Sequence, residues 1–190
     1  QVALFMPARK FSLLFIFFLL SLLPPAFSMR IVLQRVKSAS VTVDGQVVSS
    51  IGPGTLALVG LHENDTEQDL HYCAKRVLGA RLWPSESGGQ WRHGVKQRDY
   101  EILCVSQFTL YGTLSNKKQQ PDYKVAMKSQ QAEQMYNAFL QILRQQYQPE
   151  KIQDGLFGAM MDVSLVNDGP VTVMVESEPQ TCTICEAEEA

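Results

Sequence analysis

A pair of β-rich runs joined by Asp44-Gly45 constrains the fold of this chain more than any other feature. Residues 31–43 are rich in β-branched side chains, and residues 46–51 return as a second such run. Asp-Gly between two β-rich runs is a strong signal for a two-residue turn, because both central positions adopt a positive φ. The sequence therefore predicts a β-hairpin at the start of the domain.

Beyond this hairpin, strand and helix patterns follow one another. Residues 55–61 form a nearly continuous apolar run, typical of a buried strand. The sequence from Thr66 to Asp69 resembles a capping box and predicts a helix that ends near Gly79. Further strands are expected over 81–83, 101–110, 163–166 and 171–175, and a longer helix over 124–147. We expect the last two strands to form a terminal hairpin, which gives a single α+β domain with two main helices.

The two ends of the chain differ from its middle. Basic residues, an apolar run over residues 11–23 and then small residues have the layout of a secretory signal peptide. The run is shorter than the about 20 residues of a membrane-spanning helix. The alternative is that residues 1–28 lie upstream of a natural start at Met29. Both interpretations place the domain at residues 29–176, followed by an acidic, disordered tail over 177–190.

The charge balance excludes one broad class of protein. The chain has 17 Lys and Arg residues against 19 Asp and Glu residues, which gives a net charge of -2. Histones and architectural DNA binders are strongly basic, so this chain does not belong to that class. An enzyme that contacts a nucleic acid through a small patch stays compatible with this balance. One basic cluster is either such a patch or a solvated helix start; it comprises Lys117, Lys118, Lys124 and Lys128.

Two short motifs are candidates for chemistry. The first, Ser106-Gln107-Phe108-Thr109-Leu110, is a predicted strand end rich in polar groups. A nucleophile at Thr109 needs an adjacent base, yet no histidine lies near it in sequence. The second motif, Asn167-Asp168-Gly169-Pro170-Val171-Thr172, predicts a turn whose exposed backbone carbonyls can bind an ammonium group. An ordinary strand end and an ordinary β-turn are the alternatives for the two motifs.

The cysteines indicate no strong metal site. Cys182 and Cys185 form a CxxC pair, which is either half of a zinc site or two free thiols in the tail. No second pair of suitable spacing accompanies it, because Cys73 and Cys104 lie in a predicted helix and a predicted strand. Four cysteines are also too few for a disulfide scaffold, so the hydrophobic core must hold the fold.

Four segments in this order are similar to the D-aminoacyl-tRNA deacylase family: 29–41, 76–79, and the Ser106 and Asn167 motifs. The resemblance covers residues 29–176. It implies a barrel-like core of antiparallel-rich sheets in β/β/α layers. It also implies a homodimer that hydrolyses the ester joining a D-amino acid to tRNA, with no cofactor and no metal. The domain is expected to avoid membranes and to act in the cytoplasm, unless residues 1–28 direct the chain to an organelle or the secretory route.

The resemblance also implies roles for individual residues. Ser106, Gln107, Phe108 and Thr109 would line the catalytic pocket, with backbone N–H groups near Phe108 and Thr109 polarising the ester carbonyl. The carbonyls of Gly169 and Pro170, joined by a cis peptide bond, would enter the partner subunit's pocket, bind the substrate amino group and exclude an L-side chain. The terminal 2′-hydroxyl of tRNA would assist hydrolysis in place of Thr109. The other substrate-binding residues implied are Met161, Arg35 and Asn167.

This chain departs from the family pattern at residues 117–123, where relatives commonly carry Lys-Gly-Asn-(Arg/Lys)-Pro-x-Phe. Loss of that glycine predicts a changed loop beside the pocket. The chain keeps Ser106 and Phe108, which a sister branch of relaxed chirality replaces with Pro and Ala, so the D-specific branch is favoured. A silent tRNA-binding relative would have lost one of the two motifs, and neither is lost. A secreted or anchored protein that uses residues 1–28 is a third hypothesis.

Overall fold

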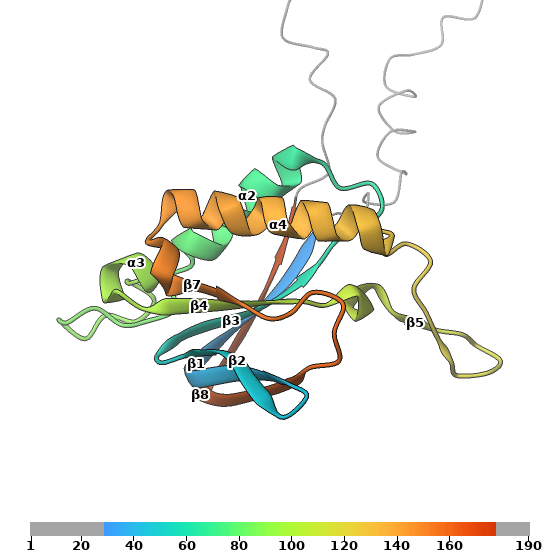
Figure 1. The fold of residues 1–190 in the computed structure, drawn as a ribbon. Helices are drawn as coiled ribbons and strands as arrows, with labels where there is room; N and C mark the ends of the chain where they lie inside the picture. Colours follow the sequence, from blue (N-terminus) through green and yellow to red (C-terminus); the bar gives the residue numbers. More distant parts are fainter. Residues whose placement is uncertain (1–28, 178–190) are drawn as a thin grey trace, which may run out of the picture.

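The computed structural model describes residues 29–177, so the predictions for residues 1–28, for most of the tail and for Cys182 and Cys185 lie outside the described residues. The fold is α+β, as predicted, with a nearly closed, barrel-like mixed sheet and two main helices (Figure 1). The elements in chain order are β1 (Arg30–Val43), β2 (Gln46–Ile51), β3 (Gly54–Gly60), α2 (Glu67–Gly79), α3 (Val95–Arg98), β4 (Glu101–Ser106), the 3₁₀ helix η1 (Phe108–Tyr111), β5 (Thr113–Leu114), β6 (Pro121–Asp122), α4 (Ser129–Gln146), the 3₁₀ helix η2 (Pro149–Lys151), β7 (Ile152–Asp154) and β8 (Asp162–Glu176).

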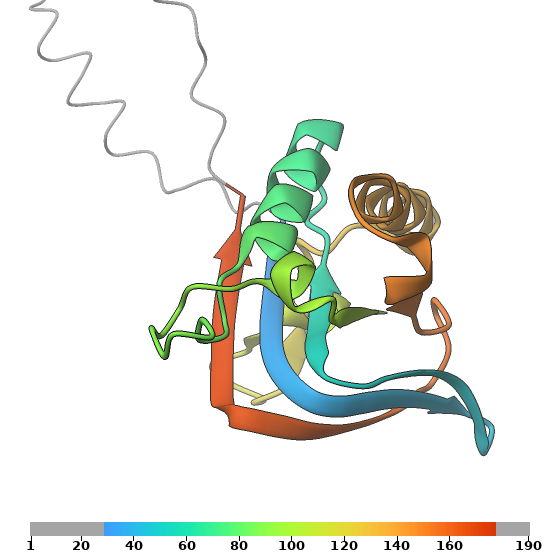
Figure 2. The same cartoon turned by 90° about the vertical axis from the view of Figure 1, so that its left-hand side faces the viewer.

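The long strand β1 organises the sheet. Its first half pairs antiparallel with β3, and its second half pairs antiparallel with β2 across the turn at Asp44 and Gly45, where φ is 50° and 79°. The predicted N-terminal hairpin is therefore confirmed. β8 follows the other side of β1, and the two strands bend together around the sheet (Figure 2). The pairs β3–β4 and β4–β7 are parallel, which makes the sheet mixed.

The predicted terminal hairpin is wrong, because β8 is one strand that runs antiparallel along β1. Thr172 pairs with Gln34, and Asn167 pairs with Val36, so residues 168–171 loop out opposite the single residue Arg35. The Gly-Pro pair thus marks a bulge within a strand and causes no chain reversal. We call residues 168–171 the β8 bulge.

Three other element predictions need correction. The strand predicted over 101–110 ends at Ser106, and the chain then turns into η1. The strand predicted over 81–83 is reduced to one bridge between Trp83 and His93. The long helix begins at Ser129 because the preceding residues follow the end of β3, where the Met127 N–H donates to the Leu61 carbonyl at 3.0 Å.

The helices α2 and α4 cover one face of the sheet (Figure 1). The predicted capping box opens α2, since the Asp69 carboxylate accepts a hydrogen bond from the Thr66 N–H at 2.8 Å. Apolar side chains from both helices, such as Leu70 and Phe139, meet the sheet in the main core. A second, smaller core lies among strand residues that include Val41 and Leu103. These two cores fix the position of the end of β4, where the first motif begins.

The start of β3 provides a test of the sheet. A Cβ atom on Gly54 would lie 2.0 Å from the Glu101 carbonyl oxygen of β4, so Gly54→Ala has to separate two paired strands. We expect the free energy of unfolding to fall by about 2–3 kcal/mol in chemical denaturation. Gly79→Ala in α2 is the control, because a Cβ there meets nothing within 4 Å and the stability should be unchanged or slightly higher. Equal stability of the two variants would contradict this pairing.

Candidate functional site

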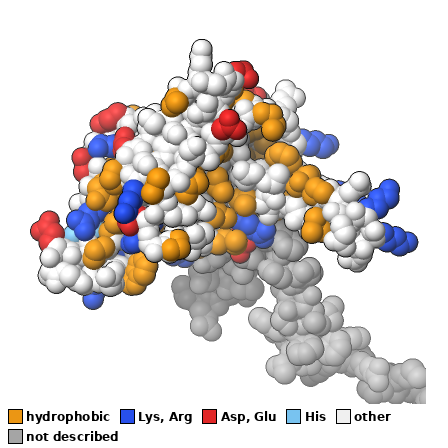
Figure 3. Space-filling view, turned by 90° about the horizontal axis from the view of Figure 1, so that it is seen from below, with side chains coloured by type: hydrophobic (Ala, Val, Ile, Leu, Met, Phe, Trp, Pro, Cys, Tyr) orange, Lys and Arg blue, Asp and Glu red, His pale blue; other side chains and the backbone are white. Residues whose placement is uncertain are grey.

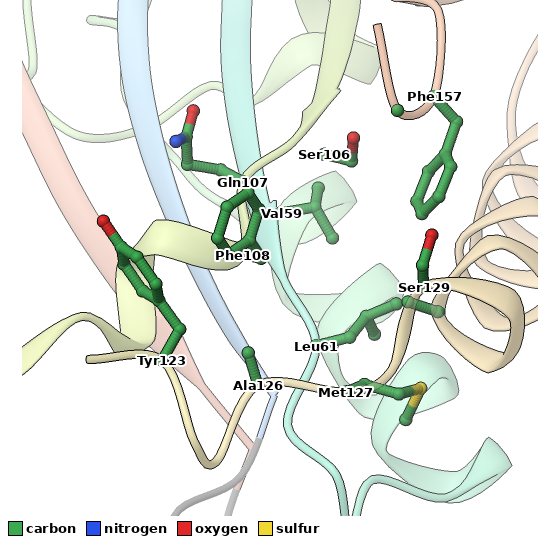
Figure 4. Close-up of a pocket in the computed structure, with 12 residues that line it drawn as sticks. Val59, Leu61, Ser106, Gln107, Phe108, Tyr123, Ala126, Met127, Ser129 and Phe157 are labelled. Carbon is green, nitrogen blue, oxygen red and sulfur yellow. The ribbon is translucent and has the colours of Figure 1, made fainter. Parts of the chain in front are cut away.

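A pocket of about 420 Å³ opens where β4 ends and η1 begins. Figure 4 shows Phe108 and Tyr123 on one side of it and Phe157 and Ser129 on the other. Segments distant in the sequence therefore form one concave surface, the usual shape of a small-molecule site. The lining residues are Val59, Leu61, Ser106, Gln107, Phe108, Tyr123, Ala126, Met127, Ser129, Ala132, Phe157 and Gly158.

The first motif forms one wall of this pocket. The Gln107 N–H donates to the Val59 carbonyl at 2.7 Å, which fixes the chain where it leaves β4. The first hydrogen bond of the turn joins the Leu110 N–H to the Gln107 carbonyl at 3.2 Å. The N–H groups of Phe108 and Thr109 precede that bond and have no carbonyl partner within the 3₁₀ turn. The turn thus presents two backbone donors beside the pocket.

Side chains of the first motif also contact one another and the opposite loop. The Phe108 side chain is 58% exposed, and its ring meets the Tyr123 ring edge to face at a centroid distance of 5.0 Å. The Gln107 side-chain amide donates a hydrogen bond to the Thr109 hydroxyl. Because an amide cannot accept a proton at neutral pH, this contact does not activate Thr109 as a nucleophile.

The 3₁₀ helix η1 is held from behind by β1 and β3. The Arg30 guanidinium donates to the Leu110 carbonyl at 3.0 Å and lies 5.3 Å from the centre of the Tyr111 ring. Gly60 permits the close approach, since a Cβ there would lie 3.1 Å from the Tyr111 ring and 3.2 Å from the Leu110 Cβ. Contacts with two strands therefore fix the orientation of the backbone donors of η1.

A buried polar cluster lies behind η1, at the end of β3. Burial raises the pKa of Asp65 to about 7, although its carboxylate accepts the His62 N–H at 2.7 Å. Burial also lowers the pKa of His62, whose ring meets the Tyr111 ring at a centroid distance of 5.4 Å. Neither side chain lines the pocket. This histidine is close to the motif in space although distant in sequence, and it supports η1 from the rear.

The described pocket wall contains no side chain that commonly acts as a general acid or base. Among its described lining residues there is no Asp, Glu, His, Lys, Arg or Cys, and the polar side chains are Ser106, Gln107, Tyr123 and Ser129. Within residues 29–177, no three His, Cys, Asp or Glu side chains gather in a way that could hold a metal ion. Burial raises the pKa of both Cys73 and Cys104 to about 12, so these thiols stay protonated. The pocket thus offers a substrate hydroxyl groups, an amide group and apolar surface.

The second motif lies in the β8 bulge, with a cis peptide bond between Gly169 and Pro170. Arg35 holds the bulge: its Nε atom donates to the Asp168 carbonyl at 3.0 Å and lies 3.1 Å from the Asp168 carboxylate. The same guanidinium donates to the Leu82 carbonyl. Arg35 is largely buried, whereas Gly169 and Pro170 are exposed. The sequence signals both Arg35 and the turn, and the structure adds the contact between them.

The structure brings some of the predicted site residues together and leaves others apart. Ser106, Gln107 and Phe108 line the pocket, with Thr109 adjacent in η1. The residues outside the lining are Gly169, Pro170, Met161, Arg35 and Asn167. Met161 packs at the second core, and Asn167 is exposed beside the β8 bulge. A single chain therefore does not unite the two motifs in this pocket.

Several lining residues were absent from the prediction. Met127, Phe157 and Gly158 come from two connecting segments and Ser129 from the start of α4, none of which carries a motif. Among the lining residues absent from the prediction, only Tyr123 belongs to a loop that the sequence singles out. A pattern search for polar or reactive groups misses such residues, because most of them contribute apolar surface alone. None of the helices in the described part of the chain is long and apolar enough to cross a membrane.

Comparisons with known proteins agree on one family. The family model described as D-Tyr-tRNA(Tyr) deacylase matches residues 32–176. The D-aminoacyl-tRNA deacylase of Dictyostelium discoideum is 48% identical over 151 residues, which are 79% of this chain and 99% of that relative. The Drosophila melanogaster D-aminoacyl-tRNA deacylase is 50% identical over 155 residues, 82% of this chain and 96% of the relative. The Homo sapiens D-aminoacyl-tRNA deacylase 1 is 48% identical over 156 residues, 82% of this chain and 74% of the relative.

Two solved structures share the fold of this chain. One described as c-Myc DNA Unwinding Element Binding Protein has a TM-score of 0.74 and 47% sequence identity, covering 78% of this chain and 98% of that one. Another, described as a probable eukaryotic D-amino acid tRNA deacylase, has a TM-score of 0.69 at 14% identity, covering 79% of this chain and all of that one. At this low identity the second structure shows a common fold alone.

Proposed function

Because this chain belongs to the D-aminoacyl-tRNA deacylase family, we propose that it hydrolyses the ester bond between a D-amino acid and the 3′ end of tRNA. The products are free tRNA and a free D-amino acid, which is thereby kept out of translation. Charged tRNA is the substrate of protein synthesis, so the reaction belongs in the cytoplasm. The observation that carries this proposal is the pocket at Ser106–Phe108, where a family motif meets a cavity of ligand size.

The ester carbonyl is polarised by backbone dipoles. The N–H groups of Phe108 and Thr109 lack partners within the first turn of η1, so they can donate hydrogen bonds to the carbonyl oxygen that becomes negative in the transition state. Arg30 and Gly60 support this role, because they fix η1 against β1 and β3 before the substrate arrives. A donor set fixed in this way needs no rearrangement during the reaction.

The substrate supplies the group that assists the attacking water. No carboxylate or imidazole lines the described pocket, and the Thr109 hydroxyl accepts a hydrogen bond from the Gln107 side-chain amide. The 2′-hydroxyl of the terminal ribose is next to the ester in the substrate itself and can orient the water. The water oxygen then bonds to the carbonyl carbon, the bond from that carbon to the 3′-oxygen breaks, and a proton passes to the 3′-oxygen.

A second copy of the chain completes the site. No carboxylate that would pair with the substrate ammonium is among the described lining residues of the pocket, whereas the β8 bulge presents the carbonyls of Gly169 and Pro170. Within residues 29–177, β8 pairs with β1 alone, so its outer edge can face another subunit. We assign the ammonium and the chirality filter to Gly169 of the partner subunit and Pro170 of the partner subunit. A thousandfold preference for the D-ester requires about 4 kcal/mol, which a rigid backbone wall can provide by steric exclusion.

Met161 and Asn167 lie in the segment that leads to the β8 bulge, and Arg35 fixes the bulge. Arg35 acts through its bonds to Asp168 and so positions the bulge. Met161 and Asn167 belong to the segment that presents it, at the second core and at the bulge margin respectively.

Mixing two damaged variants tests whether the site is shared. Phe108→Ala removes a pocket wall, and Gly169→Ala distorts the β8 bulge, so each homodimer should have low activity. In a mixed dimer, one of the two sites combines an intact pocket with an intact bulge. We therefore expect co-refolded or co-expressed subunits to recover about a quarter of the wild-type rate of D-Tyr-tRNA hydrolysis. Activity of the mixture equal to the mean of the two separate variants would place both motifs in one subunit and overturn the shared site.

A further inference from the structure

A narrow hairpin projects from the body of the protein beside the pocket. Residues 113–122, which we call the lysine hairpin, consist of the short strands β5 and β6 and their connection (Figure 1). The stem pairs Thr113 with Asp122, and the Ser115 N–H donates to the Gln120 carbonyl at 3.0 Å. The hairpin is ordered by these bonds and exposes nearly all of its side chains.

The tip of the lysine hairpin carries positive charge without compensating acids. Lys117 and Lys118 are exposed, and neither has an ion pair with any residue among 29–177. The tip, residues 115–120, reads Ser-Asn-Lys-Lys-Gln-Gln and contains no Asp or Glu. Lys124 differs, because Asp122 pairs with it at 2.8 Å. Lys and Arg side chains gather at the end of the molecule where the hairpin projects (Figure 3). On a chain of net charge -2 this end is a local exception.

Both ends of the lysine hairpin join the walls of the pocket. The chain enters the hairpin from η1, whose Phe108 lines the pocket, and leaves it into Tyr123, which lines the same pocket. Gly112 allows close packing where the hairpin joins the body of the protein, since a Cβ there would lie 2.8 Å from the Tyr123 ring and 2.9 Å from the Thr109 carbonyl. The base of the lysine hairpin is therefore fixed beside the pocket, and the tip projects from it.

We propose that the tip of the lysine hairpin binds backbone phosphates of the tRNA acceptor arm and so guides the charged 3′ end into the pocket. The inference rests on the proposed function for the identity of the RNA. Four to five residues at about 3.3 Å each put the tip about 15 Å from the pocket rim. At that distance the lysines reach phosphates several nucleotides before the ester. Exposed Lys, Asn, Gln and Ser side chains are typical contacts to phosphate and sugar, and they carry no sequence preference.

The test compares the full-length wild-type protein with the double variant Lys117→Gln/Lys118→Gln. The readouts are the Kd for uncharged tRNA, the KM for D-Tyr-tRNA, and the KM for a D-tyrosyl ester of adenosine that has no phosphate. We expect the Kd and the KM for tRNA to rise about tenfold at low salt, with kcat unchanged. The slope of log Kd against log salt concentration should fall by about one to two. The KM for D-Tyr-tRNA divided by the KM for the adenosine ester should therefore be higher in the variant than in the wild-type protein.

Lys75→Gln/Lys96→Gln is the matched control, because it removes two positive charges from α2 and α3, away from the hairpin. The inference is overturned if the hairpin variant binds uncharged tRNA as tightly as wild type, or if the control variant loses as much affinity. Failure of the proposed function looks different: the wild-type protein would then cleave neither ester. The uncharged-tRNA measurement still decides the role of the lysines in that case.

Discussion

Gly169→Ala is expected to lower the rate of D-Tyr-tRNA hydrolysis at least about 100-fold while the protein stays folded. Gly169 has φ of +127°, a conformation that L-residues rarely adopt. An added Cβ would lie 2.8 Å from Val171 Cγ2 and 3.3 Å from the Arg35 guanidinium, so the β8 bulge has to shift. A displacement of about 1 Å in a group that positions the substrate can cost about 100-fold in rate.

Gly45→Ala is the control for the change in backbone conformation. Gly45 has φ of +79° in the β1–β2 turn, and a Cβ there meets nothing within 4 Å. Both variants should lose about 1–2 kcal/mol of stability, since each places an alanine at positive φ. Steady-state hydrolysis and chemical denaturation, measured on both proteins, separate the two effects. Full activity of Gly169→Ala would remove the bulge from the site.

The second large effect is expected in the substrate. Replacing the terminal adenosine of D-Tyr-tRNA by 2′-deoxyadenosine, with the ester kept on the 3′-oxygen, should lower kcat at least about 100-fold. General acid–base assistance is worth about 10²–10⁴-fold, and the described pocket wall provides no acid or base to replace the lost hydroxyl. Single-turnover hydrolysis of the two esters measures this difference directly.

The uncatalysed hydrolysis of both esters has to be measured in parallel, because the 2′-hydroxyl also assists the reaction in free solution. The relevant quantity is the enzymatic rate divided by the uncatalysed rate for each ester. Equal kcat for the two esters would mean that a protein group assists the water. The Thr109 hydroxyl, which accepts a hydrogen bond from the Gln107 amide, would then be the first candidate for that group.

The sequence predicts local structure well where turn and cap chemistry is strong. Asp44-Gly45 specifies the first hairpin, and Thr66 with Asp69 specifies the start of α2, because each depends on neighbouring residues alone. The Ser106 motif is correctly predicted at the end of a strand, but the predicted strand runs on to Leu110, whereas β4 stops at Ser106 and the chain turns into η1. The family motif, rather than the chemistry of its side chains, singled it out as part of a site.

The errors arise where long-range pairing overrides a local signal. Asn-Asp-Gly-Pro has the composition of a turn, yet β1 is long enough to pair with residues on both sides of it, so β8 continues past the bulge. Residues just before Ser129 have a helical pattern, but Met127 bonds to Leu61 at the end of β3 and the helix starts later. Phe157 joins the pocket only through the packing of a distant loop. No local pattern contains that information.

Release of tyrosine from D-Tyr-tRNA and from L-Tyr-tRNA by the same preparation of full-length protein tests the central claim most directly. The account predicts that the D-ester is hydrolysed rapidly and the L-ester at least about a thousandfold more slowly, a difference of about 4 kcal/mol at the transition state. Hydrolysis of both esters at similar rates would contradict the chirality filter. Hydrolysis of neither ester by folded, tRNA-binding protein would contradict the proposed activity itself.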